Sequence, residues 1–448
     1  MVPLWSAEAF NRFTATLAQT ERLPRPQFDL YQTSLLKRLV SFAFKESPFY
    51  REQLKPLFRN SDEPDFSAWR DIPILTRGDI ADQGERMNPV RTTSELGAIT
   101  TRKTSGTTGA GLSFRTCDIA QLAAECMMHR LYRWHGFDLE KPMASIRYYS
   151  SGRRTYPHGI TEPHWCFAHP APHYTLDYRT SVGEMMEWLV RRGPTYFLTF
   201  PSIAHDLAKS ISADRAGELG LEAIVGISEL VSSDTAADVH KRMGCKILQI
   251  YACAEMGCIA LQSEADGELQ VCEETVLVEI LDDRGDPVRP GETGRVILTS
   301  LYNYATPFIR YEIGDHATLS DNPWPAGRTL RRLRRVTGRS RNCLFARDGS
   351  RRWDETVITP RLCQAIPTHN FQIRQPAAGA LEIAYVADGG KAAKPDKQAL
   401  QDHFAELLGG SVDVRLVPLQ ELTRSSGGKR ERIVSALASV AADCPTAA

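Results

Sequence analysis

Thr104-Ser-Gly-Thr-Thr-Gly-Ala-Gly111 is a run of small hydroxyl residues and glycines with no bulky side chain in it. Glycines permit positive φ and a close approach of backbone, so consecutive N–H groups can converge on an anion while the hydroxyls add donors. The sequence therefore predicts a phosphate-binding loop formed by Thr104, Ser105, Gly106, Thr107, Thr108 and Gly109. A Walker A loop is excluded, because Leu112 stands where that motif requires lysine.

Apolar patterns on both sides of this loop predict an α/β fold. A strand end at 98–101 precedes the loop and a helical pattern begins near Asp118, so we expect the loop to join a strand to a helix. Residues 1–90 are expected to be mainly helical. Beyond the loop, buried strands (143–149, 196–200, 223–227, 246–251) are expected to alternate with covering helices (120–129, 182–190). Such alternation indicates largely parallel sheets with ligands at the carboxyl ends of the strands.

The rest of the chain predicts a β-rich subdomain and then a second domain. Segments 276–281 and 294–300 form a hairpin pattern, and the basic run 328–335 is expected to be a solvated strand. Beyond it, 371–374 and 381–386 are expected as strands and 397–408 as a helix. We therefore expect a domain boundary after this run and an α+β segment beyond about residue 343; the family resemblance given below implies a large domain over 1–339, a hinge at 339–343 and a small mobile domain over 343–448.

Composition excludes several other classes of protein. Lys+Arg and Asp+Glu each number 54, so no global charge recruits nucleic acid or an anionic membrane. The start has no basic-then-apolar pattern, and no apolar run approaches the ~20 residues that a membrane span needs. We expect a cytoplasmic protein that binds neither nucleic acid nor membrane and that can form a homodimer.

Four further segments identify a family. Tyr251-Ala-Cys-Ala-Glu255, Ile309-Arg-Tyr-Glu-Ile-Gly-Asp315, Gly338-Arg339 and Ser426-Gly-Gly-Lys429 follow the loop in this order. Over nearly its whole length the chain resembles the adenylate-forming (acyl-CoA synthetase-like) superfamily, and within it the phenylacetate-CoA ligase branch and its capsular-polysaccharide-associated relatives. Segments 39–51 and 71–76 resemble that branch's N-terminal helix and entry segment, and 301–311 resembles its core strand.

The resemblance implies roles in ATP-dependent activation of a carboxylic acid. The loop at 104–111 would hold the β- and γ-phosphates, and Glu255 would hold Mg²⁺, since a hard cation prefers carboxylate oxygen. Asp315 would accept hydrogen bonds from both ribose hydroxyls, and Arg339 would lie over ribose and phosphate. Lys429 is implied as the catalytic lysine that bridges the carboxylate and the α-phosphate. Residues implied around adenine are Ser228, Glu229, Leu230, Tyr251 and Ala252.

The acid and its acceptor are specified less fully. The implied acid pocket contains Tyr148, Tyr149, Phe200, Pro201 and Ala254, whose flat apolar faces favour a small aromatic acid. CoA is the expected acceptor. An amine or a carrier-protein thiol is the alternative, and a non-catalytic nucleotide-binding descendant is a third reading. Departures from the family pattern bear on this choice: Ala252, Ala254, Ala110-Gly111 in place of Lys-Pro, and Arg341-Asn342 in place of an acidic hinge.

Two groups of metal-ligand residue types lie outside these motifs. His158, His164, Cys166, His169 and His173 crowd a proline-rich segment that we expect to be a substrate-side loop, with zinc as the alternative. Cys253, Cys258 and Cys272 form the second group, which we interpret as buried thiols without a metal.

Overall fold

The computed structural model describes residues 5–59, 61–104, 111–149, 152, 154–211, 219–322, 327–339, 342–353, 357, 360–366, 368, 370–387, 394–422, 424 and 429–437. The chain divides into two compact units. One contains Met1–Ile313 with Ala317–Val336, and the other contains Gly314–His316 with Thr337–Ala448. The predicted hinge at 339–343, and motion about it, stays a prediction.

The N-terminal region is helical, as predicted. Its elements are α1 (Ala7–Thr20), α2 (Arg25–Glu46), α3 (Pro48–Gln53) and α4 (Arg77–Met87), with 3₁₀ turns at Lys55–Phe58, Phe66–Asp71 and Ser94–Leu96. α4 begins at a capping box in which Thr76 and Asp79 satisfy each other's backbone N–H groups. None of the described helices is long and apolar enough to cross a membrane.

Five parallel strands form the part of the large sheet that matters for function. Their order is β8 (Lys246–Cys253), β7 (Ala223–Gly226), β6 (Tyr196–Thr199), β3 (Met143–Arg147) and β5 (His173–Asp177), with β4 (Ile160–Glu162) antiparallel at the edge. Between them come α5 (Asp118–Trp134), α6 (Val182–Arg192), α7 (Pro201–Ser210) and α8 (Ser233–Met243). The predicted alternation of strands and helices is therefore confirmed.

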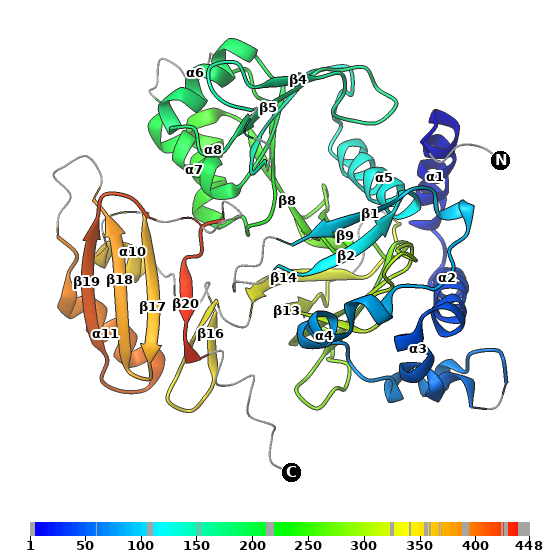
Figure 1. The fold of residues 1–448 in the computed structure, drawn as a ribbon. Coiled ribbons are helices and arrows are strands. Elements are labelled where there is room, and N and C mark those ends of the chain that lie inside the picture. Colours follow the sequence, from blue (N-terminus) through cyan, green and yellow to red (C-terminus); the bar gives the residue numbers. More distant parts are fainter. Residues whose placement is uncertain are drawn as a thin grey trace. The chain divides into compact units, whose positions relative to one another are not determined.

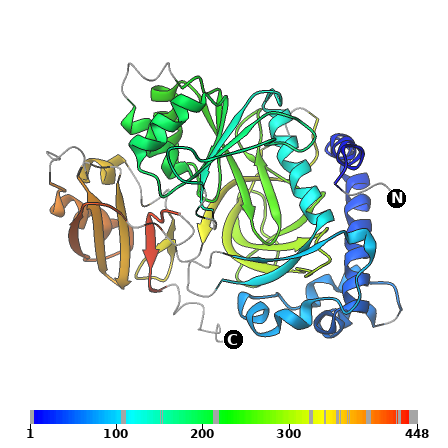
Figure 2. The ribbon, with the colours of Figure 1, turned by 45° about the horizontal axis from the view of Figure 1, so that its top comes forward.

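The two faces of these strands belong to different cores. Met143, Tyr196, Val225 and Leu248 pack in one cluster with apolar residues of α5. Their neighbours along the strands, Ala144, Phe197, Ile224 and Ile247, pack in a second cluster with α6, α7 and α8. Side chains alternate between the faces of a sheet, so every second residue of β3, counted from Met143, points toward the α5 side. Figure 2 shows the strands between the α6–α8 group and α5.

The remaining strands of this sheet are antiparallel or mixed. They are β9 (Gly257–Gln262), β10 (Leu269–Val271), β11 (Val276–Leu281), β12 (Thr293–Ser300), β13 (Tyr311–Leu319) and β14 (Arg332–Arg339). β11 and β12 form the predicted hairpin. The described strands run in the order β11-β12-β13-β14-β10-β9-β8, which joins this region directly to the parallel part (Figure 1).

The structure corrects the sequence predictions at three places in this region. Segment 301–311 is not a strand, because β12 ends at Ser300 and β13 begins at Tyr311; the connection between them is largely buried and braces Tyr50, whose hydroxyl donates to the Pro307 carbonyl (2.8 Å). The motif at 309–315 is expected from the sequence to end a strand at Asp315, but Asp315 lies inside β13. The basic run is a solvated strand only in part: it enters β14 at Arg332 and exposes Arg334 and Arg335, but Arg328 and Arg332 are buried, with Arg332 paired to Asp266 and Glu268.

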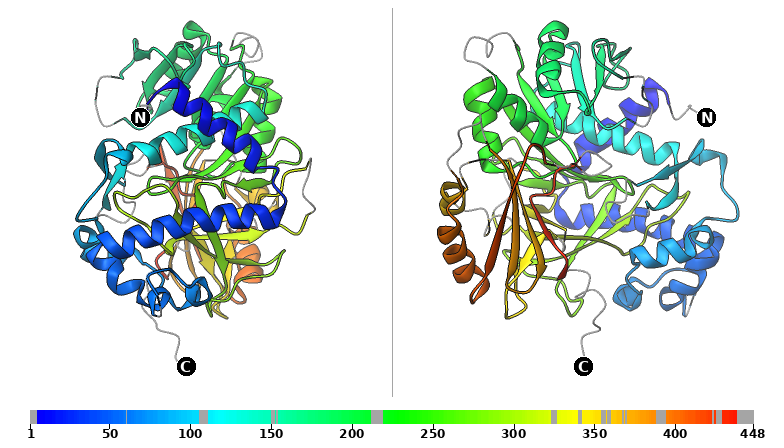
Figure 3. Two further views of the ribbon diagram at one scale, coloured as in Figure 1. Left: turned by 90° about the vertical axis from the view of Figure 1, so that its right-hand side faces the viewer. Right: turned by 60° about the vertical axis from the view of Figure 1, so that its left-hand side comes forward.

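A buried ionic cluster ties the N-terminal helices to the β-rich region. The Arg130 guanidinium lies 2.7 Å from Glu274 and 3.3 Å from Glu21, and its side chain is 1% exposed. Thr20 at the end of α1 donates to the same Glu274 carboxylate (2.9 Å). The long helix α2 crosses the β-rich strands (Figure 3), where Gln32 donates to the Glu273 carbonyl (2.7 Å).

The second unit contains its own core. Its main sheet has the order β19 (Asp413–Leu419), β18 (Ala380–Val386), β17 (Phe371–Ala377), β20 (Ile433–Ser435). A small hairpin of β15 (Cys343–Phe345) and β16 (Arg351–Trp353) and two helices, α10 (Pro360–Ala365) and α11 (Lys397–Leu408), complete the described elements. The predicted helix at 397–408 and both predicted strands are confirmed, since Leu400, Phe404 and Leu408 of α11 pack into this core.

Candidate active site

The carboxyl ends of four neighbouring strands carry most of the predicted site. Thr199 of β6 pairs with Gly226 of β7 and with Ile146 of β3, and Gly226 pairs with Gln249 of β8. Because these strands are parallel and in adjacent register, the residues that follow their ends lie along one edge of the sheet. The residues there are Tyr148 and Tyr149 after β3, Phe200 and Pro201 after β6, Ser228, Glu229 and Leu230 after β7, and Tyr251, Ala252, Ala254 and Glu255 at the end of β8.

Glu255 is a buried carboxylate at the end of β8 for which the described part of the chain offers no partner. It is 8% exposed, and it makes no hydrogen bond or ion pair with any of the described residues. A buried charge is costly unless it is paired or binds a cation. Its carboxylate oxygens are hard ligands of the kind that Mg²⁺ prefers, and no described residue competes for them. Glu255 therefore fits the Mg²⁺ role that the sequence predicts.

The strand that leads to Glu255 changes register just before it. Tyr251 pairs with Ala260 of β9, but the next residue, Ala252, pairs with Cys258. Such an irregularity bends a strand and redirects the side chains that follow it. Ala252 and Ala254 are exposed, and Tyr251 is mostly buried in the core on the α5 side. Whether the Tyr251 ring stacks on adenine stays a prediction.

The turn after β7 has an unusual backbone. Ser228 has φ +66°, a conformation that favours glycine, and Leu230 is exposed. Between them, the Glu229 carboxylate accepts hydrogen bonds from the backbone N–H (2.9 Å) and hydroxyl (3.1 Å) of Ser202 in the first turn of α7. Glu229 therefore fixes this turn to α7.

Aromatic rings gather at the ends of β3, β5 and β6. Tyr178, which sequence reasoning missed, lies 6.3 Å from both the Tyr148 ring and the Phe200 ring between centroids. Tyr148 is 44% exposed, whereas Phe200 is buried. Three aromatic rings thus lie near one another at these strand ends, and their role as an acid pocket stays a prediction. The position of Tyr178 directly after a strand was the available signal.

Three arginines surround Tyr149. The Arg154 guanidinium lies 4.2 Å from the ring centroid and Arg147 lies 5.1 Å from it, while Arg179 donates to the Tyr149 carbonyl (3.5 Å). Arg154 is paired with Glu162 (2.6 Å), and Arg179 is paired with Asp177 through two contacts (2.7 and 2.8 Å). Sequence reasoning named none of these arginines.

A polar chain holds Arg154 in place. The Ser145 hydroxyl lies 2.6 Å from His173 Nε2, and His173 Nδ1 lies 3.2 Å from Glu162, the partner of Arg154. Burial lowers the pKa of His173 to about 4, although the neighbouring Glu162 carboxylate acts in the opposite direction. His173 is thus neutral near pH 7, and its protonated Nδ1 donates to Glu162. The chain connects β3, β5 and β4 to the Tyr149 ring.

The predicted phosphate-binding loop closes a hairpin. Thr104 directly follows β1 (Ile99–Lys103) and exchanges hydrogen bonds with Leu112, which precedes β2 (Ser113–Cys117); both bonds are 2.9 Å. The loop therefore leads into a strand and not directly into α5, which corrects the prediction. Ser105, Gly106, Thr107, Thr108 and Gly109 lie outside the described residues.

Three predicted residues belong to the second unit. Asp315 is 9% exposed in β13. Arg339 is the last residue of β14, and Lys429 is half-buried shortly before β20.

The histidines and cysteines singled out from the sequence are dispersed. Among the residues that the structure describes, no group of three or more His, Cys, Asp or Glu side chains could hold a metal ion. Cys258 and Cys272 are buried, as predicted, and Cys253 is partly buried.

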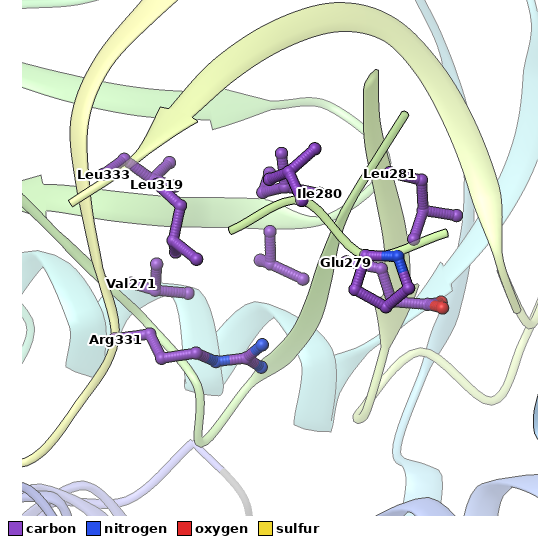
Figure 4. A pocket seen from close by; sticks show the side chains of 10 residues that line it. Val271, Glu279, Ile280, Leu281, Leu319, Arg331 and Leu333 are labelled. Carbon is purple, nitrogen blue, oxygen red and sulfur yellow. The ribbon is translucent and has the colours of Figure 1, made fainter. Parts of the chain in front are cut away.

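A cavity of about 120 Å³ in the β-rich region is not a convincing reaction site. Its lining is mainly aliphatic, with Arg331 and Glu279 as its charged residues (Figure 4). Arg331 is paired with Glu273 (2.6 Å) and Glu279 with Arg310 (3.3 Å). With both charges committed, the cavity has no ionic group left to orient an anionic substrate.

Comparison with known proteins shows which enzymes the chain resembles. Residues 161–303 match the family model described as AMP-binding enzyme. The Thermus thermophilus protein named phenylacetate-coenzyme A ligase is 24% identical over 466 residues, covering 93% of this chain and 98% of that protein. The chain is thus similar to members of the adenylate-forming superfamily. Its enzyme class is adenylate-forming acid ligase.

A second related protein and a solved structure are also similar to this chain. Protein CapK of Staphylococcus aureus is 21% identical, covering 75% of this chain and 74% of CapK. A solved 2-hydroxyisobutyryl-CoA ligase, crystallised after adenylation with R3-HIB-AMP, is 16% identical with a TM-score of 0.73, covering 95% of this chain and 93% of that one. This structural likeness shows that the α/β fold of adenylate-forming ligases extends over nearly the whole chain.

Proposed function

We propose that this enzyme uses ATP to convert a small carboxylic acid into its acyl adenylate, releasing pyrophosphate, and then transfers the acyl group to CoA. The observation that carries the proposal is Glu255: a buried carboxylate without a described partner, at the same sheet edge as the aromatic residues after β3 and β6. A cation site beside an apolar acid site is what adenylate formation requires.

The chemistry sets the task of each residue. The acid's carboxylate attacks the α-phosphate, so two anions approach and negative charge develops on pyrophosphate. Mg²⁺ held by Glu255 would supply charge that offsets those oxygens. Lys429, a flexible point charge, would bridge the acid and the α-phosphate. Asp315 would accept from the ribose hydroxyls, Arg339 would lie against ribose and phosphate, and the 104–109 loop would donate N–H groups to the outer phosphates.

The acid is proposed to be aromatic. Tyr148, Tyr178 and Phe200 offer ring faces and edges at the strand ends, and aromatic rings prefer such neighbours at centroid distances of roughly 4.5–7 Å. CoA is supported as acceptor by the names of the Thermus relative and the solved ligase, both of which specify CoA. The sequence at Arg341-Asn342 keeps an amine or a carrier-protein thiol as the alternative.

Two assays on the purified protein test the proposal. Pyrophosphate release is measured with ATP, Mg²⁺ and a panel of aryl and short aliphatic acids; we expect at least one aryl acid to support it. If no acid does, the protein is a non-catalytic nucleotide binder. Acceptor trials with CoA, an amine and a carrier protein then follow acyl transfer, and transfer to the amine alone would replace CoA in the proposal.

A further inference from the structure

Arg147 differs from the two other arginines around Tyr149 because no carboxylate among the described residues pairs with it. It is exposed at the carboxyl end of β3, and its Nε donates to the Tyr149 hydroxyl (3.2 Å). Arg154 and Arg179 each have an ion-pair partner, but Arg147 makes no ion pair with any of the described residues. One of three clustered guanidinium groups therefore keeps its full charge available for a ligand.

The ring of Tyr149 fixes the direction of this charge. Arg147 and Arg154 both lie over that ring, at 5.1 and 4.2 Å from its centroid. A guanidinium held against an aromatic face loses little freedom when it binds, and its planar fork matches the two oxygens of a carboxylate or a phosphate. The polar chain from Ser145 to Glu162 holds Arg154, and so supports the ring that Arg147 contacts.

The strand pattern gives the side to which Arg147 points. Arg147 has the same parity in β3 as Met143, which packs in the core on the α5 side. Glu125 lies on α5, and no described residue forms a hydrogen bond or an ion pair with it. Burial raises the pKa of the Glu125 carboxyl, and the charge of Arg147 offsets part of this rise. The charges of Arg147 and Glu125 therefore interact, although the two side chains form no ion pair.

We propose that Arg147 binds an anionic oxygen group, a carboxylate or a phosphate, that is distinct from the reacting carboxylate. The group belongs either to the acid, which would then carry a second carboxylate, or to the phosphates of the acceptor CoA. Its place directly before Tyr148 and Tyr149, at the sheet edge of the acid site, favours the acid. This inference rests on the proposed function for the identity of the ligand, but its test reads binding and not turnover.

Calorimetry distinguishes an anion site from a structural arginine. Isophthalate and benzoate are titrated into the protein without ATP, and succinate and butyrate serve as a ring-free pair. In the pair that fits the acid site, we expect the wild type to bind the dicarboxylate more tightly than the monocarboxylate. In Arg147→Gln that preference should fall roughly tenfold or more, the scale of a charged hydrogen bond. Arg147→Lys keeps the charge and should retain part of it.

Two further variants separate ligand binding from a change of local charge or folding. Arg179→Gln removes a nearby arginine that is already paired, and should leave the preference unchanged. Glu125→Gln removes a competing negative charge, and should raise the preference by roughly two- to fivefold. A dicarboxylate preference that falls in Arg147→Gln and rises in Glu125→Gln cannot arise from general damage to the fold.

The CoA source has its own readout. If Arg147 binds a CoA phosphate, Arg147→Gln weakens binding of CoA but not of pantetheine, which has the thiol without phosphates, and the dicarboxylate preference does not change. Unchanged preference in both comparisons overturns the inference. Pyrophosphate release by Arg147→Gln with a monocarboxylic acid is recorded separately, so failure of this inference is distinguishable from failure of the adenylation proposal.

Discussion

Replacing Glu255 with glutamine should make the protein more stable and much less active. In the absence of metal and ATP, Glu255 is 8% exposed and has no partner among the described residues, so its charge opposes folding. An unsatisfied buried group costs roughly 1–3 kcal/mol, and because the side chain is not fully buried we expect the lower end, about 1 kcal/mol. Urea unfolding in EDTA measures this gain as a higher midpoint at unchanged slope.

The same variant should lose adenylation. Pyrophosphate release should fall by at least about a hundredfold, and half-maximal activity should need more Mg²⁺, because a neutral amide is a weaker ligand for a hard cation than a carboxylate. Mg²⁺ with ATP should also stabilise the wild type against urea more than it stabilises Glu255→Gln.

A buried glutamate that already has partners is the matched control. Glu274 accepts from Arg130 (2.7 Å) and Thr20 (2.9 Å), so Glu274→Gln leaves the Arg130 charge undercompensated and should destabilise the protein by about 3 kcal/mol. The reasoning about Glu255 is refuted if Glu255→Gln is destabilised like this control, or if it releases pyrophosphate at the wild-type rate with wild-type Mg²⁺ dependence.

Four further predictions follow. Lys429→Ala should abolish pyrophosphate release while ATP binding changes only a few-fold, because the lysine acts on charge that develops in the transition state; normal release would remove it from the mechanism. Asp315→Ala should weaken ATP binding by roughly 1.5–3 kcal/mol in calorimetry, and an unchanged affinity in the folded variant would exclude ribose binding. Arg130→Met should cost roughly 3–5 kcal/mol in urea unfolding unless the apolar side chain repacks; a variant as stable as the wild type would show that this cluster is dispensable. Burial lowers the pKa of His173 from 6.5 to about 4, so neutral His173 favours the folded state above pH 6.5 and this contribution is lost as the pH falls toward 4. His173→Gln should reduce that loss in urea midpoints measured across the range, and an identical pH dependence would contradict it.

The parallel part of the fold could be predicted because each element carries a local pattern. Segment 246–251 is apolar as a strand buried on both faces must be, and segment 182–190 has the apolar spacing of a helix that covers a sheet. The observed elements, β8 and α6, each extend two residues beyond the predicted carboxyl end. Order along the chain then placed the predicted residues at one edge, since successive parallel strands end on the same side.

The errors come from interactions between distant residues. Segment 301–311 is apolar like a strand, but its backbone is used in bracing Tyr50 and the β2 hairpin, with Thr306 accepting from the Arg115 N–H (2.9 Å). Arg332 looks solvated in a basic run, yet Asp266 and Glu268 neutralise it from a loop that no local pattern links to it. Arg154 likewise differs from Arg147 in having an ion-pair partner, because Glu162 of β4 contacts Arg154.

Pyrophosphate release with ATP, Mg²⁺ and a panel of carboxylic acids, without any acceptor, tests the central claim most directly. The claim predicts acid-dependent release with at least one aryl acid, formation of the matching acyl adenylate in stoichiometric amount, and loss of both in Glu255→Gln. Absence of release with every acid of the panel in a folded, ATP-binding protein would contradict it.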